Sequence, residues 1–427
     1  MLVNKERVDR FLDELQLDGL IATSRENTTY LTDFLAVNYI LDQMKFDHFS
    51  SSGDNFLQTY GIYTKGSRPA LVIPVSMFMS VPTDGGVLPE VFTYGRPFFM
   101  QTSKPDFDTL EEKAFFEHLD EPSRNFASAA DALSGAVKEF MTGEEVGVDF
   151  SDLHPSSKAA LEKKNRLRLK NAKGLFKVLR LVKSGEEVAR LKASAEMNER
   201  ALNRTFEAAK TGVSELELRR VYARSIVSED GDFDTGHFIV GSGTKSGAPL
   251  GRANNRKLAK GSILKLDVTS KLRGYYADTG DTGIVGRPTK KQERVYEALG
   301  EAVRRSEELA VPGTRPSELH REVLKVWDKY AVERPPTGMG HGIGLEVHEY
   351  PVVSDPNSVF VPKGATIKDD LIDVPADAPL EEGMVLNLEA PYLMWGIGGI
   401  HLEHTVLLGK RKSRPLTKQE RHLRLLS

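Results

Sequence analysis

Apolar positions near the start of the chain follow two different spacings. Val8, Leu12 and Leu15 fall three or four positions apart, which predicts the buried face of an amphipathic helix. Uninterrupted apolar runs at 19–23 and 69–74 have the length of buried strands. The alternation of these patterns predicts that the chain begins with an α/β domain.

A change of composition follows within 149–184. Lysine and arginine dominate the stretch 163–170, which we interpret as the solvated side of a connecting helix rather than as a surface for nucleic acid. We place a domain boundary near residue 175, so that the predicted domains are 1–175 and 176–427.

The second domain carries sequence signals for four helices, arranged in two pairs. The typical start is a serine or threonine with a glutamate or glutamine three positions later, and Gly212 and Pro312 mark helix ends. Each pair is followed by a hairpin pattern, so the order helix–helix–hairpin occurs twice and predicts pseudo-twofold symmetry. The predicted helix starts lie at Ser184, Ser214, Thr289 and Ser317.

The first hairpin pattern carries two aspartates. An apolar run at 263–268 leads into a polar turn and returns. If the turn centres between Leu272 and Arg273, Asp267 lies directly opposite Asp278, with about 5 Å between the Cβ atoms. Two carboxylates at that separation repel each other unless a positive charge lies between them, which points to a metal ion.

The second hairpin pattern carries two glutamates in the same relationship. Glu389 and Glu403 are equidistant from Gly396, in a glycine-rich turn, so they too are predicted to face each other. Between the two hairpins lies a loop, 340–349, that contains His341. Four carboxylates and a histidine form an oxygen-rich ligand set without thiolate, which suits Mn²⁺ better than structural zinc. Two ions sharing these ligands would lie roughly 3.5–4 Å apart and could activate a bridging water.

Glycines 338–344 could instead cradle a phosphate, but the stretch lacks the Lys-Ser/Thr ending of a P-loop and the spacing of a dinucleotide site. Phosphate binding is therefore not expected.

Composition narrows the class of protein. With 427 residues, 40% hydrophobic, the chain can form two domains with real cores. A net charge of −3 gives no electrostatic attraction for nucleic acid or an anionic membrane, and no apolar run approaches the length of a membrane span. The N-terminus lacks the hydrophobic region of a signal peptide, and cysteine is absent. We expect a soluble, cytoplasmic protein without nucleic-acid or membrane partners.

These motifs resemble those of the pita-bread metallopeptidases, a family that includes aminopeptidase P, Xaa-Pro dipeptidase, methionine aminopeptidase and the non-metal relative creatinase. The resemblance covers 266–278, 340–349 and 389–403, with spacings of 11 between the aspartates, 7 between the histidines and 14 between the glutamates, as in the proline-peptidase branch. It implies an α+β fold, in which a C-terminal pita-bread domain with pseudo-twofold symmetry follows a smaller creatinase-like α/β N-terminal domain. The segment 27–34 resembles the start of that N-terminal domain.

The resemblance also implies roles for the site residues. Asp267 would hold one ion, Asp278 and Glu403 would bridge two, and His341 with Glu389 would complete the second. The ions would be Mn²⁺, with Co²⁺, Zn²⁺ or Fe²⁺ as alternatives.

The implied reaction is hydrolysis of an Xaa-Pro peptide bond by a water that bridges two metal ions. Glu389 would accept its proton, and His348 would hydrogen-bond the substrate and stabilise the tetrahedral intermediate. The implied partners are a small peptide or amide substrate and a second copy of the chain, as a homodimer.

Several positions depart from the family pattern. Leu250 replaces a substrate-binding histidine, Asp281 replaces an arginine, and 401–404 reads His-Leu-Glu-His where Arg-Ile-Glu-Asp is common. On a strand, His401 shares a face with Glu403 and therefore faces the metals, whereas His404 faces away. We interpret His401 as a partner of the metal ligands, with an added nitrogen ligand or a polar filler as alternatives. If they point inward, Asp281 and the loss of arginine make the substrate pocket less positive.

These departures leave three hypotheses. The first is a two-metal Xaa-Pro peptidase. The second is a hydrolase of a small non-peptide C–N bond, as in creatinase or ectoine hydrolase. The third is a non-catalytic module that binds other proteins, against which the retained ligands argue.

Overall fold

The chain divides into two compact units. The computed structural model describes all residues except 1, 36–57, 82–88, 97–106, 334–337 and 419–421. The first unit runs to Arg180 and includes 368–373, and the second comprises the rest of the chain from Leu181. This division falls after residue 180, and the predicted boundary lies near residue 175.

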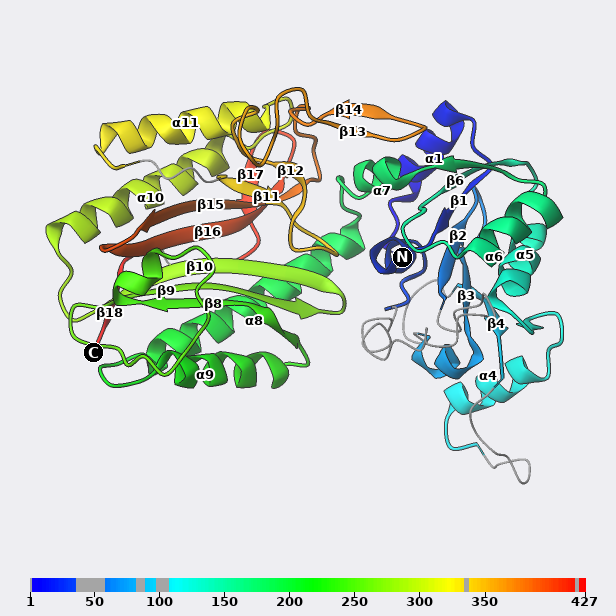
Figure 1. The fold of residues 1–427 in the computed structure, drawn as a ribbon, viewed down its shortest axis with the longest axis horizontal. Coiled ribbons are helices and arrows are strands. Elements are labelled where there is room, and N and C mark those ends of the chain that lie inside the picture. The colour runs from blue at the N-terminus through cyan, green and yellow to red at the C-terminus, as the bar shows by residue number, and fades with distance from the viewer. Residues whose placement is uncertain (1, 36–57, 82–88, 97–106, 334–337, 419–421) are drawn as a thin grey trace. The chain divides into compact units, whose positions relative to one another are not determined.

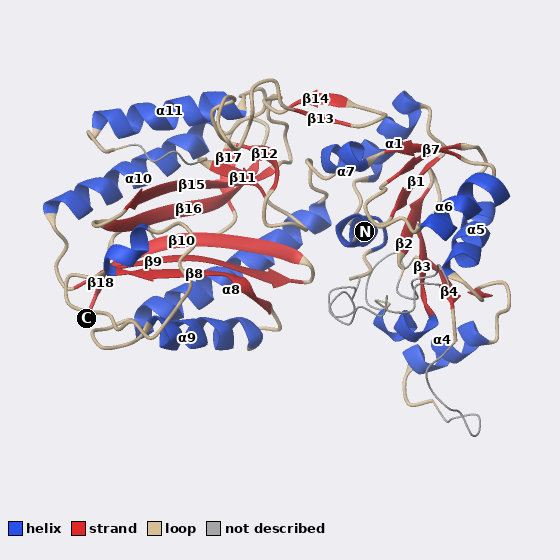
Figure 2. Cartoon of the chain, viewed as in Figure 1, coloured by secondary structure: helices blue, strands red, loops and turns tan. Residues whose placement is uncertain are grey.

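The first unit contains a mixed seven-stranded sheet in the order β5-β4-β3-β2-β1-β6-β7 (Figures 1 and 2). The apolar run at 19–23 forms the buried strand β1, and α1 presents Val8 and Leu12 to the interior, as predicted. Helix α5 packs against β3 and β4. The elements are α1 (Lys5–Leu15), β1 (Gly19–Ala22), α2 (Arg25–Thr32), β2 (Tyr60–Tyr63), β3 (Ala70–Pro74), η2 (Val75–Ser80), β4 (Glu90–Tyr94), α4 (Leu110–Leu119), β5 (Asn125–Phe126), α5 (Ala129–Phe140), β6 (Glu145–Val148), α6 (Pro155–Ala159), η3 (Ala160–Lys164), β7 (Arg168–Asn171) and α7 (Lys173–Leu179).

The basic stretch 163–170 is not one side of a helix. It begins in the π-helical turn η3 and ends in the edge strand β7, which is parallel to β6. Leu167 is buried, and Arg168 and Lys170 form ion pairs with Glu144 and Glu145 at 2.6 and 2.9 Å. The alternation of leucine and cations every second residue is a strand pattern, which explains why the helix prediction was wrong.

The second unit consists of two sheets and two helix pairs, as the repeated helix–helix–hairpin order predicted. Helices α8 and α9 cover the sheet β18-β10-β9-β8. Helix α10 packs against the sheet β12-β11-β15-β16-β17, and α11 packs against α10. Capping boxes at Ser184, Ser214 and Thr289 begin α8, α9 and α10 as predicted, whereas α11 begins at Pro316, one residue early.

The bounds in the second unit are as follows: α8 (Gly185–Ala208), α9 (Glu215–Val227), β8 (Asp232–Ser242), η4 (Gly243–Gly247), β9 (Ile263–Leu272), β10 (Tyr275–Val285), α10 (Lys290–Leu309), α11 (Pro316–Lys329), β11 (Gly340–Gly342), β12 (Glu349–Val352), β15 (Val385–Met394), β16 (Gly398–Leu408), β17 (Ser413–Pro415) and β18 (Arg424–Leu426). A two-stranded ribbon, β13 (Thr366–Lys368) and β14 (Asp373–Pro375), has its tip in the first unit.

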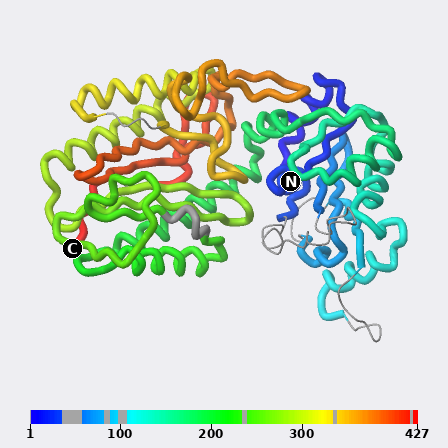
Figure 3. The backbone as a smooth tube through the Cα atoms, in the orientation of Figure 1, coloured from blue at the N-terminus to red at the C-terminus, as the bar shows by residue number. Residues whose placement is uncertain are grey.

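The two long hairpins lie side by side although they are far apart in the sequence. Strand β16 contacts both β9 and β10, and Figure 3 shows the green segment 263–285 beside the red segment 385–408. The facing surfaces of these hairpins hold the acidic residues identified from the sequence. Among the described helices, none combines the length and the apolar character needed to cross a membrane.

Candidate metal centre

The glutamate pair lies as predicted. Strand β15 is antiparallel to β16, and Glu389 is directly opposite Glu403 across a loop whose middle residue, Gly396, has a positive φ of 86°. The Glu403 side chain is 2% exposed and the Glu389 side chain 22% exposed. One carboxylate of the pair is therefore buried, and the other is partly exposed.

The aspartate pair is offset from the predicted register. Asp267 lies opposite Gly280, and Asp278 lies opposite Thr269. The prediction was wrong because the turn is the residue pair Arg273–Gly274, with φ values of 50° and 84°, and this pair moves the centre of the hairpin by one residue. A shift of the turn by one residue moves the pairing by two, so both aspartates still project from the same face of the sheet.

His341 comes from β11, a short strand between β12 and β15. It lies opposite Asn387, and its flanking glycines allow close approach of the neighbouring strands. A Cβ on Gly342 would lie 2.2 Å from the carbonyl oxygen of Tyr350, and one on Gly340 would lie 2.3 Å from that of Asn387. The glycines of this motif thus serve strand packing, in agreement with the absence of a phosphate-loop ending.

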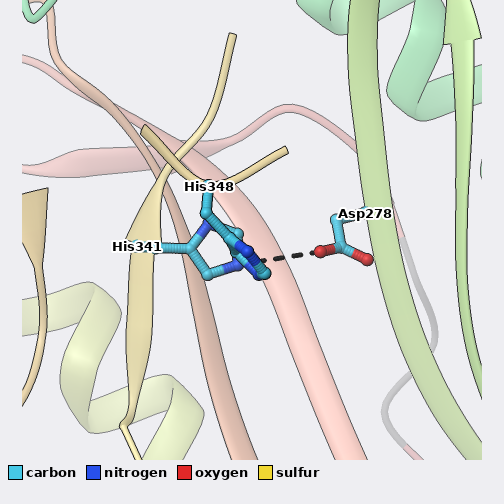
Figure 4. A group of neighbouring side chains, drawn as sticks. All are labelled: Asp278, His341 and His348. Atoms are coloured by element: carbon cyan, nitrogen blue, oxygen red, sulfur yellow. Dashed lines mark ion pairs between the residues drawn. The ribbon is translucent and has the colours of Figure 1, made fainter. Parts of the chain in front are cut away.

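The residues predicted from the two hairpins and the loop meet in one cluster. His341 Nε2 lies 3.6 Å from Asp278 Oδ2, and the His348 ring packs edge-on against His341 with 4.2 Å between ring centroids (Figure 4). Donor atoms lie within 4.8 Å of one another in each of three overlapping groups: Asp278, His341 and His348; Glu389, His401 and Glu403; Asp267, Asp278 and Glu403.

Burial and mutual repulsion shift the titration of these groups. Burial, followed by the charges of Glu403 and Asp267, raises the pKa of Asp278 well above its usual range. Burial also raises the pKa of Glu403, against the influence of His401. Burial lowers the pKa of His341 to about 4, so this imidazole is neutral at pH 7 and can offer a lone pair. Crowded carboxylates beside a neutral imidazole are a favourable setting for a divalent cation.

Two buried oxygens provide an independent test of whether the cluster fits a metal ion. Asp278 Oδ1 and Glu403 Oε1 have no hydrogen-bond partner among the described residues. Glu403 Oε2, in contrast, accepts a 2.8 Å hydrogen bond from Asn387 Nδ2. Because buried carboxylate oxygens are rarely left without a partner, both atoms fit donors to a metal ion.

His401 faces the cluster, as predicted. Its Nδ1 lies 3.4 Å from Asp267 Oδ2, and its Nε2 lies 3.2 Å from Glu389 Oε2. Burial lowers the pKa of His401, but the Asp267 carboxylate outweighs this effect and the pKa is raised well above its usual range. The imidazole thus bridges two carboxylates from different hairpins. His404 points the other way, as predicted, and lies 2.8 Å from Glu307.

Of the two residues expected at the substrate pocket, Asp281 lies elsewhere. Asp281 is fully buried and forms a 2.5 Å ion pair with Arg424 of β18. It is three residues from Asp278 and therefore projects from the opposite face of β10, so it does not make the pocket less positive. Leu250 is 81% exposed, which does not fit a residue lining a closed pocket.

Two residues of the cluster's surroundings were not predicted. Asn387 is fully buried and holds Glu403, as described above. Lys265 is 1% exposed, lies two residues from Asp267 on the same face, and donates a 3.4 Å hydrogen bond to the carbonyl oxygen of Ala248. Strand alternation could have identified both, since each is a polar residue at an inward position of an otherwise apolar strand.

The chain is similar to members of a known protein family. Residues 189–410 match the model of metallopeptidase family M24, and this stretch contains Asp267, Asp278, His341, Glu389 and Glu403. The chain is similar to an Xaa-Pro dipeptidase of Pyrococcus furiosus, with 28% identity over 288 residues, 66% of this chain and 75% of the relative.

Solved structures match over nearly the whole length. The prolidase of Pyrococcus horikoshii OT3 superimposes with a TM-score of 0.68 at 22% identity, covering 98% of this chain and 99% of that structure. The X-Pro aminopeptidase of Thermotoga maritima MSB8 gives 0.68 at 18% identity, covering 99% of both chains. These likenesses show the fold, a pita-bread domain preceded by a smaller domain. Because the family model covers more than half of the chain, the protein belongs to metallopeptidase family M24.

Proposed function

We propose that this protein hydrolyses the peptide bond before proline, in Xaa-Pro dipeptides or in longer peptides with proline in second position. The observation that carries the proposal is the convergence of carboxylates and a neutral imidazole in one buried cluster. The names of its relatives, Xaa-Pro dipeptidase, prolidase and X-Pro aminopeptidase, support the choice of substrate.

The donor set that we assign to two divalent ions consists of the residues predicted from the sequence. Mn²⁺ is the ion we expect, because four of the five donors are carboxylates. When bound, the ions would supply a water of lowered pKa and positive charge for the developing oxyanion. The proposed donors are Asp267, Asp278, His341, Glu389 and Glu403.

Two side chains are placed to act on substrate and water. Glu389 is the more exposed glutamate, so its carboxylate is the one that can accept a proton and return it to the leaving nitrogen. His401 lies 3.2 Å from Glu389 Oε2 and fixes that oxygen, so we assign the proton to the other oxygen. His348 is exposed beside His341, where its ring can donate a hydrogen bond to the substrate carbonyl.

The structure weakens the case for a non-peptide substrate. That alternative rested on Leu250 and Asp281 altering the pocket, but Leu250 is exposed and Asp281 is paired with Arg424 on the other face of the sheet. The named relatives likewise do not favour it.

The experiment is a substrate panel assayed with Mn²⁺. Xaa-Pro dipeptides and Xaa-Pro-Yaa tripeptides are compared with the matched Xaa-Ala peptides, and release of the N-terminal residue is measured. We expect cleavage of the proline series only, and a loss of about 10³-fold or more in kcat for Asp278→Asn. Asp328→Asn, at an exposed position of α11, is the matched control. Metal-loaded protein that cleaves none of the proline peptides would refute the proposal.

We further propose that the protein is a cytoplasmic homodimer whose first unit is a creatinase-type domain. The absence of cysteine is compatible with a reducing compartment, and the assembly follows from the resemblance of the sequence to the pita-bread metallopeptidases. Light scattering after size-exclusion chromatography tests the assembly: a dimer has twice the 47.4 kDa mass of one chain.

A further inference from the structure

A buried ion pair lies directly behind the loop that carries His348. Lys183 Nζ is 2.5 Å from Glu349 Oε2, and the two side chains are 2% and 5% exposed. Glu349 follows His348 in the sequence and begins β12. The chemistry proposed above uses neither member of the pair. We call residues 343–348 the histidine loop.

The second oxygen of Glu349 holds the backbone of the histidine loop. Glu349 Oε1 accepts hydrogen bonds from the amides of Leu345, at 3.0 Å, and Glu346, at 3.4 Å. A Cβ on Gly344 would lie 2.6 Å from this oxygen, so only glycine leaves room for the carboxylate. The loop therefore wraps around one buried side chain.

Both ends of this arrangement are anchored to regular structure. The Lys183 amide donates a 2.9 Å hydrogen bond to the carbonyl oxygen of Gly383, and α8 begins two residues later. On the other side, the Tyr276 amide of β10 donates a 2.9 Å hydrogen bond to the carbonyl oxygen of Gly344. The loop is thus fixed to the strand that carries Asp278 and, through Glu349, to the start of α8.

We infer that Glu349, oriented by Lys183, is a positioning residue that fixes the histidine loop so that His348 stays edge-on to His341 and open to substrate. Two acceptor bonds to the loop and one ion pair to a rigid element determine where the His348 backbone lies. The inference rests on the proposed function in that His348 acts on the peptide.

Two neutral variants separate the acceptor bonds from the buried charge. In Lys183→Met/Glu349→Gln the charges are removed together, and the amide oxygen still accepts from Leu345 and Glu346. In Lys183→Met/Glu349→Leu, the side chain at position 349 is also neutral and has nearly the size of glutamine. It has no oxygen, however, to accept these hydrogen bonds. Because each variant removes both charges of the ion pair, neither leaves a single buried charge unpaired. Should the leucine variant not fold, Gly344→Ala displaces the same carboxylate oxygen by adding a methyl group.

Two readouts test the inference. Hydrogen exchange is a readout that needs no assay of catalysis. It should be at least tenfold faster at the Leu345 and Glu346 amides in the leucine variant than in the glutamine variant. With an Xaa-Pro dipeptide and Mn²⁺, kcat should be at least tenfold lower in the leucine variant, with Mn²⁺ affinity equal in both. In the His348→Ala background this kcat difference should disappear.

Equal exchange in the two variants would overturn the inference, as would a kcat difference that persists without His348, because the effect would then be a general structural one. If the wild-type protein cleaves no proline peptide, the proposed function fails, while the exchange experiment still decides whether Glu349 holds the loop.

Discussion

His401 lies in space that any side chain at Gly280 would need. A Cβ at position 280 would lie 3.1 Å from His401 Cγ and 2.8 Å from Glu403 Oε1. Gly280 is also the residue opposite Asp267 in the hairpin. A glycine on β10 therefore allows the imidazole of β16 to reach between the carboxylates of Asp267 and Glu389.

Adding a methyl group at Gly280 should disturb the cluster. In Gly280→Ala, His401 and Glu403 must move by several tenths of an ångström, and we expect Mn²⁺ affinity and kcat each to fall by about tenfold, or about 1.4 kcal/mol. Isothermal titration of metal-free protein measures the first, and the dipeptide assay measures the second. The matched control is Gly300→Ala on α10, where the new Cβ meets only Leu402 at 4.0 Å. Equal metal affinity in the two variants would contradict the close packing at position 280.

The buried amine of Lys265 should weaken metal binding. It lies on the same strand face as Asp267, and its electrostatic partners are Asp267, Glu403 and Glu389, so its charge opposes a divalent ion among the same carboxylates. Lys265→Met keeps the apolar length of the side chain and removes the charge. We expect the Kd for Mn²⁺ to fall by about tenfold in the titration experiment. An unchanged Kd would contradict this prediction, and a higher Kd would show that the amine supports the site instead.

The pair of Asp281 and Arg424 should govern stability rather than catalysis. Removing the cation in Arg424→Met leaves a fully buried carboxylate without its ion-pair partner, and we expect the free energy of unfolding to fall by about 3 kcal/mol. The double variant Asp281→Asn/Arg424→Met should recover most of this loss and retain kcat/KM within about twofold. Denaturant titration and the dipeptide assay measure the two quantities. A large fall in kcat/KM with unchanged stability would instead place Asp281 at the substrate pocket.

Glu187 should make stability depend on pH. Burial raises its pKa to about 7, although Lys183 acts in the opposite direction. Between the ordinary value of about 4.5 and the folded value, the folded state holds a proton that the unfolded state has lost. The contribution of protonated Glu187 to the stability of the folded protein is therefore complete below pH 4.5 and is lost as the pH rises to 7.

The variant Glu187→Gln stays neutral and keeps an oxygen for the Ser184 amide. The unfolding free energy of the wild-type protein, minus that of this variant, should fall by about 3 kcal/mol between pH 4.5 and 7.5. Denaturant titrations of both proteins across this range measure the difference. Parallel curves would show that Glu187 has an ordinary pKa in the folded protein.

The sequence predicted the residues of the centre better than their register. The Glu389–Glu403 pairing followed from a glycine at the middle of the loop, and the structure confirms it. The Asp267–Asp278 pairing failed because Arg273, unlike glycine or asparagine, gives no sign that it adopts a left-handed conformation. Because side chains alternate between the two faces of a strand, Asp267 and Asp278 still share one face despite this error.

The surroundings of the centre were harder to predict because they depend on contacts distant in the sequence. The partner of Asp281 is Arg424, 143 residues later, and no local pattern connects them. Alternation alone could still have placed Asp281 on the face away from Asp278, as it correctly placed His404 away from Glu403. The space for His401 depends on Gly280 of another hairpin, which only the packing of the two sheets reveals.

The central claim is that the carboxylates of the two hairpins and His341 form a two-metal centre. Anomalous diffraction at the manganese edge, from crystals grown with Mn²⁺, tests it most directly. We predict two anomalous peaks among Asp267, Asp278, His341, Glu389 and Glu403, and the loss of at least one in Asp278→Asn. A wild-type crystal with no peak, or with peaks only outside this cluster, would contradict the claim.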